Sequence, residues 1–152
     1  MKEELKSKSE PQNEGAPEII LIEHDDYHAS YIGKTADGRQ FFFAPIFMPG
    51  GDEFVTLFLF DDEGNLVESK IENFGPRETF DREKARALRS EWLAQLGTLE
   101  YQDIRVKPFA VEHGGEMFGM IPTKYEDYWV VEVLPGNVMA FTEPWDSGIY
   151  DT

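Results

Sequence analysis

Residues Phe54–Phe60 read Phe-Val-Thr-Leu-Phe-Leu-Phe, a run in which every residue except Thr56 is apolar. Aromatic and β-branched residues favour a strand. Because apolar side chains occupy both alternating positions, both faces of this strand have to be covered. A second aromatic run, Phe41–Phe43 followed by Phe47, precedes it across the turn-like Pro49-Gly50-Gly51. We therefore expect the stretch to lie centrally in a sheet.

Further strands are expected on both sides of this stretch. Asp37-Gly38 between two strand-like runs predicts a hairpin. Residues 66–73 are expected to form a more exposed strand, because charged and apolar residues alternate there. The remaining expected strands are an early apolar run and four runs in the second half of the chain: Ile19–Ile22, Ile104–Lys107, Met117–Ile121, Tyr128–Leu134 and Val138–Thr142.

One strong helix is predicted, from about Asp81 to Leu96. Asp81 is a suitable N-cap, and Gly97 stands where a helix is expected to stop. Apolar residues recur at spacings of three and four, which makes a stripe that can pack on a sheet: Ala85, Leu88, Trp92 and Leu96. The predicted fold class is α+β, a largely antiparallel sheet of about eight strands with this helix packed on it.

Length and composition narrow the class of protein. The chain has 152 residues, and residues 18–152 are expected to form a single domain after a flexible, almost entirely polar tail at residues 1–17. Fourteen Lys and Arg against thirty Asp and Glu give a net charge of −16, which argues against nucleic-acid or membrane partners. The chain has no cysteine, so disulfides and thiol catalysis are excluded. We expect a soluble, cytoplasmic protein without a cofactor.

A dense group of possible metal ligands lies at His24, Asp25, Asp26 and His28. Two histidines four residues apart can converge on one ion, but a catalytic zinc site needs three protein ligands and an open position. The favoured interpretation is a solvated polar loop. The alternative is a small metal-binding protein or metal-dependent enzyme that uses His24, Asp26 and His28.

Two other acidic motifs are weaker. Residues 50–54 read Gly-Gly-Asp-Glu-Phe, the letters that name the diguanylate cyclase domain, but nothing in residues 1–49 matches the second metal-binding motif of that family. Carboxylates also fall at several positions of a notional calcium loop over residues 61–72, yet Leu66 stands where that loop requires glycine. Ordinary turns explain both motifs.

The helix carries a local excess of positive charge. Residues 77–89 contain five basic residues and three acidic ones, a local charge of +2 in a chain of −16. Arg82, Arg86 and Arg89 share one helix face. A solvated face with neighbouring ion pairs is the favoured interpretation, and an anion site is the alternative.

Acidic residues and large aromatics are mixed in two stretches near the C-terminus, residues 125–129 and 143–151. This composition is typical of recognition surfaces, where rings anchor a partner and charge steers it. The expected partner-binding residues are Glu126, Asp127, Tyr128, Glu143, Trp145, Asp146 and Tyr150. The alternative is that Trp145 and Tyr150 fold back to cover the open face of the sheet.

Three stretches resemble a family of small bacterial proteins that are often labelled as formate hydrogenlyase regulatory proteins of the HycA type. They are Tyr31-Ile32-Gly33 with Gln40-Phe41-Phe42, then Asp103–Phe109, and finally Phe141–Asp146 with Tyr150-Asp151-Thr152. The resemblance supplies no catalytic residue and hints at a non-catalytic role. The charge of one sign and the lack of a catalytic constellation predict an acidic binding or regulatory protein that contacts another protein, with an inhibitor- or immunity-like role against a basic partner as one form.

Overall fold

The predicted central strand lies within a five-stranded antiparallel sheet. The computed structural model describes residues 15–47, 51–136 and 139–152, without the side chains of residues 45–47. In this part of the chain the sheet runs in the order β5 (Leu66–Pro76), β4 (Asp52–Phe60), β3 (Gln40–Phe47), β2 (Ile32–Thr35) and β6 (Leu99–Tyr101). The hairpin expected at Asp37-Gly38 joins β2 to β3.

The other strands of the described residues form two smaller antiparallel sheets. A four-stranded sheet has the order β11 (Ala140–Phe141), β10 (Tyr128–Leu134), β9 (Glu116–Tyr125) and β8 (Phe109–His113). A two-stranded sheet pairs β1 (Ile20–Ile22) with β7 (Ile104–Val106). The predicted largely antiparallel α+β class with one main helix is confirmed, but the expectation of a single sheet of about eight strands is wrong, since the strands are divided among sheets of five, four and two.

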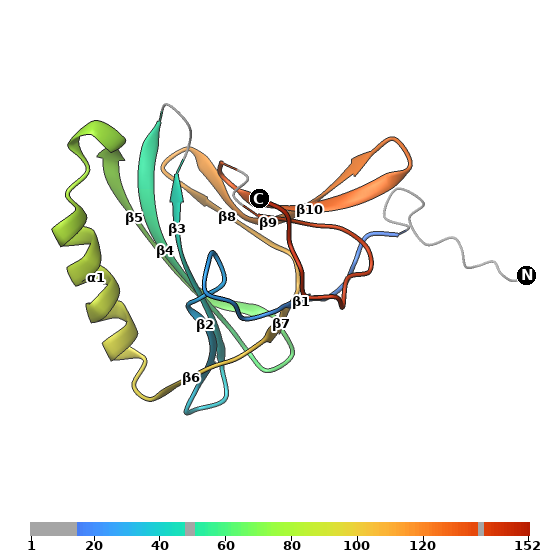
Figure 1. The fold of residues 1–152 in the computed structure, drawn as a ribbon, viewed down its shortest axis with the longest axis horizontal. Helices are drawn as coiled ribbons and strands as arrows, with labels where there is room; N and C mark the ends of the chain where they lie inside the picture. Colours follow the sequence, from blue (N-terminus) through green and yellow to red (C-terminus); the bar gives the residue numbers. More distant parts are fainter. Residues whose placement is uncertain (1–14, 48–50, 137–138) are drawn as a thin grey trace, which may run out of the picture.

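The division follows from the two apolar faces of β4. One face contributes Val55, Leu57 and Leu59 to a core under the helix, and the other contributes Phe54, Phe58 and Phe60 to a second, larger core. A single helix can cover only one of these faces. The other is covered by the two smaller sheets, which lie across the five-stranded sheet from the helix (Figure 1).

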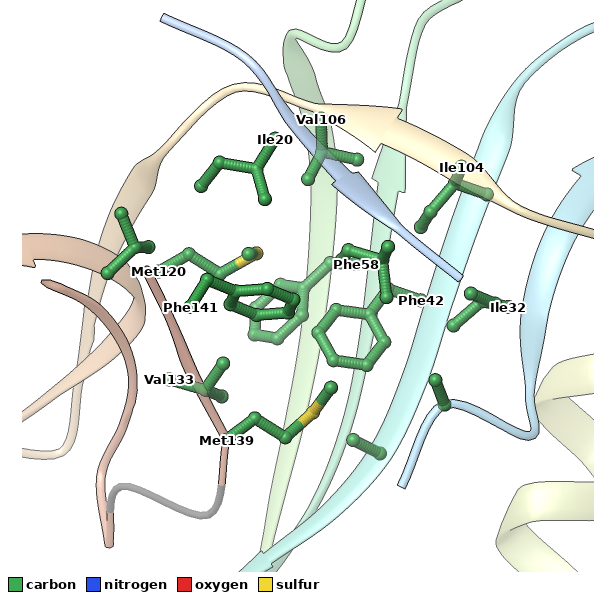
Figure 2. Packing of buried hydrophobic residues seen from close by; sticks show 14 of the residues in the cluster. Ile20, Ile32, Phe42, Phe58, Ile104, Val106, Met120, Val133, Met139 and Phe141 are labelled. Atoms are coloured by element: carbon green, nitrogen blue, oxygen red, sulfur yellow. The ribbon is translucent and has the colours of Figure 1, made fainter. Parts of the chain in front are cut away.

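The larger core draws residues from all three sheets. Phe42 and Phe58 of the five-stranded sheet meet Met120, Val133 and Phe141 of the four-stranded sheet (Figure 2). Ile20, Ile104 and Val106 of the two-stranded sheet close the cluster, each no more than 1% exposed. The β1–β7 pair is thus fixed in place from its inner face.

The helix forms as predicted. After a short 3-10 helix, η2 (Arg77–Thr79), helix α1 spans Arg82–Gln95. The Asp81 side chain caps it by accepting a hydrogen bond from the Lys84 amide at 3.1 Å. Trp92 is 9% exposed and packs under the helix, with its ring 6.4 Å from that of Phe43. Gly97 follows with a φ of +81°, a conformation that ends helices and favours glycine.

A buried glutamine ties the two-stranded sheet to the five-stranded one. Gln40 of β3 is 3% exposed. Its amide nitrogen donates to the carbonyl oxygens of Arg105 at 2.7 Å and Asp61 at 3.1 Å, and its amide oxygen accepts from the Arg105 amide at 2.8 Å.

Within the described residues, no helix combines the length and the apolar character that crossing a membrane requires.

Candidate binding groove

The outer face of the β1–β7 pair is the start of the candidate site. In this ladder Leu21 lies opposite Arg105, between the buried pairs Ile20–Val106 and Ile22–Ile104. Because successive side chains of a strand alternate between its faces, burying the two pairs turns Leu21 and Arg105 outward. Ile19, just before β1, is 41% exposed. Apolar side chains therefore remain on the solvent side of this pair.

The C-terminal segment lies along the other edge of β1. The Leu21 amide donates to the Trp145 carbonyl at 3.0 Å, and the Glu23 amide donates to the Gly148 carbonyl at 3.0 Å. Gly148 has a φ of +82°, and a Cβ placed there would lie 2.8 Å from the Cβ of Glu23. Only glycine at position 148 lets the two backbones come this close without moving apart. The close pairing of the C-terminal segment with β1 holds Trp145 beside the apolar face of β1.

These elements enclose a groove of about 680 Å³, within the range of about 300–1,000 Å³ that is typical of ligand sites. Four apolar side chains line the groove together with one basic and two acidic ones. They are Ile19, Leu21, Pro144 and Trp145, then Arg105, and finally Glu143 and Asp146. Trp145 is half-buried and packs against the larger core with one part of its surface. Glu143 and Asp146 are exposed and form no ion pair within the described residues.

Tyr150 does not line the groove and is held by hydrogen bonds to the loop after β1. Its hydroxyl donates to the Asp25 carboxylate at 2.5 Å and accepts from the His28 amide at 3.1 Å. Partial burial and the hydrogen bond to Asp25 raise the pKa of Tyr150 to about 12. Burial acts to raise the pKa of Asp25, but hydrogen bonds from Tyr150 and from the Tyr27 and Ala29 amides outweigh it and hold that pKa below its ordinary value. Tyr150 thus packs against the larger core and links the C-terminal segment to the loop after β1.

The other acidic aromatic stretch lies elsewhere. Glu126, Asp127 and Tyr128 occupy the exposed tip of the β9–β10 hairpin, which projects away from the 143–151 segment (Figure 1). Tyr128 is 54% exposed, and its ring lies 6.1 Å from that of Tyr125. The structure therefore divides the predicted partner-binding residues among three places: the β9–β10 tip, the groove, and the contact of Tyr150 with Asp25. It brings Glu143, Trp145 and Asp146 together in the groove.

The residues of the possible metal cluster have separate contacts. The Nε2 atom of His24 lies 3.1 Å from the Ser30 carbonyl oxygen, and the ring of His28 packs 3.9 Å from that of Tyr27. Across residues 15–47, 51–136 and 139–152, no three His, Asp or Glu side chains are grouped so that they could hold a metal ion. The use of His24, Asp26 and His28 by a metal stays a prediction, which metal analysis of the purified protein would test.

The two weaker acidic motifs, residues 50–54 and residues 61–72, make ordinary local contacts where the structure describes them. Gly50 lies outside the described residues. Glu53, in the first residues of β4, forms a 2.7 Å ion pair with Arg77, and the Asp52 carboxylate accepts from the Asn73 side chain at 2.9 Å. In the β4–β5 turn, Asp61 accepts hydrogen bonds from the backbone amides of Glu63 and Asn65, both at 2.9 Å. This is the behaviour of a turn aspartate.

Sequence reasoning missed three residues of the groove: Ile19, Leu21 and Arg105. The alternation of outward and inward residues in the two short strands was visible in the sequence. The pairing of β1 with β7, which are far apart in the chain, was not visible in the sequence.

No family model, curated protein or solved structure matches this chain.

Proposed function

We propose that this protein is a non-catalytic binding protein whose groove at Trp145 accepts a basic, apolar segment of a partner protein. The observation that carries the proposal is the composition of the groove: an apolar floor of Ile19, Leu21 and Trp145, at whose side the exposed acids Glu143 and Asp146 outnumber the one basic residue, Arg105. Such a surface suits an apolar side chain flanked by Lys or Arg.

The charge of the whole chain supports a basic partner. A net charge of −16 attracts positively charged molecules over several ångströms and repels acidic ones. Glu143 and Asp146 have no ion pair within the described residues, so their charge is available to an incoming Lys or Arg. We expect charge to set the rate of association more than the lifetime of the complex.

The half-buried position of Trp145 supports a role as an anchor. Tryptophan is enriched among the residues that carry most of the binding energy at interfaces. One part of the ring rests on the larger core, so little side-chain freedom remains to be lost on binding. A regulatory or inhibitor-like role against a basic protein agrees with this arrangement.

Capture of a partner from a lysate of the source cells tests the proposal when three baits are compared. The baits are the wild type, the groove variant Glu143→Gln with Asp146→Asn, and the hairpin variant Glu126→Gln with Asp127→Asn. The two variants lose the same amount of charge at exposed positions. We expect a partner that the wild type and the hairpin variant retain at low salt and the groove variant loses.

The association rate of that purified partner completes the test. The groove variant should associate more slowly than the wild type, with little change in dissociation, and the difference should shrink at high salt as charges are screened. If the hairpin variant loses the partner and the groove variant keeps it, binding takes place at the β9–β10 tip and the groove proposal is wrong.

A further inference from the structure

A second cavity lies on the opposite side of the five-stranded sheet, beside the N-terminal half of α1. It has a volume of about 170 Å³. Phe43, Phe80 and Ala85 contribute apolar walls, and Arg82, Arg86 and Arg89 line the helix side. The cavity therefore combines an apolar interior with a concentration of positive charge.

Two of these arginines have no carboxylate partner within the described residues. The Arg82 guanidinium carbon lies 5.7 Å from the centre of the Phe80 ring, and that of Arg89 lies 5.1 Å from the centre of the Tyr31 ring. Neither forms an ion pair there. Arg86 pairs with Glu83 at 3.0 Å, but both side chains are largely exposed, and such pairs are weak.

Arg82 and Arg89 lack a carboxylate partner within the described residues, although acidic residues outnumber basic ones by thirty to fourteen in the whole chain. The ring contacts orient the guanidinium groups of Arg82 and Arg89 and leave N–H donors for an incoming acceptor. Arginine is the side chain best suited to bind a carboxylate or phosphate through paired hydrogen bonds.

We propose that this cavity binds a small aromatic anion, a single ring that carries a carboxylate or a phosphate. The ring enters between Phe43, Phe80 and Ala85, and the anionic group meets Arg82 and Arg89. The size supports one ring, because an apolar protein cavity of about 150 Å³ accepts benzene. This site is independent of the groove at Trp145, from which the five-stranded sheet separates it.

Titration of the full-length protein with phenyl phosphate, followed by the shifts of backbone amide signals in NMR, tests the proposal. We expect saturable shifts confined to the first half of α1 and the adjacent parts of β3 and β4. Inorganic phosphate lacks the ring and benzyl alcohol lacks the charge, so each should bind about tenfold more weakly or worse. Equal binding of inorganic phosphate, or shifts spread over the whole surface, would overturn the proposal.

Variants of matched charge identify the residues. Arg82→Gln and Arg89→Gln should each weaken phenyl phosphate binding about tenfold, the loss of one charge-assisted contact. Lys84→Gln removes the same charge from the same helix outside the cavity, and it should change the affinity less than about twofold. If Lys84→Gln weakens binding as much as the arginine variants do, only a diffuse field attracts the anion and the site is refuted.

Ala85→Met provides a test that does not alter charge. Its longer side chain fills the space for the ring, so we expect it to abolish the advantage of phenyl phosphate over inorganic phosphate. The melting temperature shows whether each variant is folded, and only folded variants are compared. Undiminished phenyl phosphate binding by folded Ala85→Met would show that the ring does not enter this cavity.

Discussion

At the scale of single residues, Trp145 and Tyr150 differ although they are close in sequence and similar in kind. Tyr150 is held by hydrogen bonds to Asp25 and to the His28 amide, and it links the C-terminus to the loop after β1. Trp145 packs on the core with one part of its surface and lines the groove with another. Composition alone identified both as possible anchors. It could not separate them, because their partners lie more than a hundred residues away.

Tyr150→Phe should lower stability in a pH-dependent manner. The lowered pKa of Asp25 gives stabilisation that is present above its ordinary value of 3.8 and is lost as the pH falls through its folded value. The raised pKa of Tyr150 gives stabilisation that is present below 10.0 and is lost as the pH rises towards about 12. We expect a loss of about 1 kcal/mol between these limits, since the pair is only partly buried.

Urea unfolding of the wild type and Tyr150→Phe at a series of pH values measures this loss. The difference in unfolding free energy should be largest between pH 3.8 and 10.0 and should shrink on either side. A difference that stays constant from acid to alkaline pH would mean that the Asp25–Tyr150 hydrogen bond does not contribute, and that only the packing of the ring matters.

Trp92→Ala should destabilise the protein by about 3–5 kcal/mol, the usual cost of emptying a large aromatic site in a core. The ring is 9% exposed and packs between α1 and the five-stranded sheet. Urea unfolding measures the cost, and Trp92→Phe, which keeps a ring there, should lose less. A loss below about 1 kcal/mol would contradict the packing of the helix through this residue.

At the scale of elements, local signals predicted most of the structure. The helix, its Asp81 cap and its Gly97 stop, and the hairpin at Asp37-Gly38 follow from residues that lie near one another in sequence. The pairing of β1 with β7 does not. Each strand has three residues, too few to specify a partner by its own pattern. The groove is built on this pair, which is why Ile19, Leu21 and Arg105 were missed.

Gln40→Leu should loosen the two-stranded sheet from the five-stranded one. The change leaves the Arg105 amide and two carbonyl groups without the side-chain partner they have in the wild type. Because unsatisfied buried groups each cost about 1–3 kcal/mol, we expect a loss of about 2–4 kcal/mol and faster hydrogen exchange at the Arg105 amide. The control Gln95→Leu, at an exposed position, should cost less than about 0.5 kcal/mol. Unchanged exchange at Arg105 would contradict the role of Gln40.

At the scale of the whole molecule, the need to cover both faces of β4 determines the architecture. The sequence predicts one helix and a strand that is apolar on both sides, so a second layer of strands has to cover the face away from the helix (Figure 1). The expected single sheet of about eight strands contains no such second layer. Most strands were predictable from local sequence patterns, but β6 and β8 were not expected, and the division into three sheets depends on contacts between distant segments.

The N-terminal tail provides a prediction at this scale. A chain that starts at Gly15 should melt at the same temperature as the full chain, because residues 1–14 contain almost nothing apolar. A chain that starts at Glu18 also loses Gly15, which lies against the Trp129 ring, and we expect a drop below about 2 °C. Calorimetry checks both. A drop of several degrees would mean that residues 15–17 are docked as part of the domain.

The affinity of the protein for a peptide selected from a random library shows whether the groove binds a basic, apolar segment, when it is measured by calorimetry for the wild type and Trp145→Ala. We predict that selection yields peptides in which Lys or Arg flank an apolar residue. The folded variant should bind the tightest of them about thirtyfold more weakly, the loss of about 2 kcal/mol expected for an anchoring ring. Equal affinity for both proteins, or selection of acidic peptides, would contradict the assignment of the groove as a site for a basic, apolar partner.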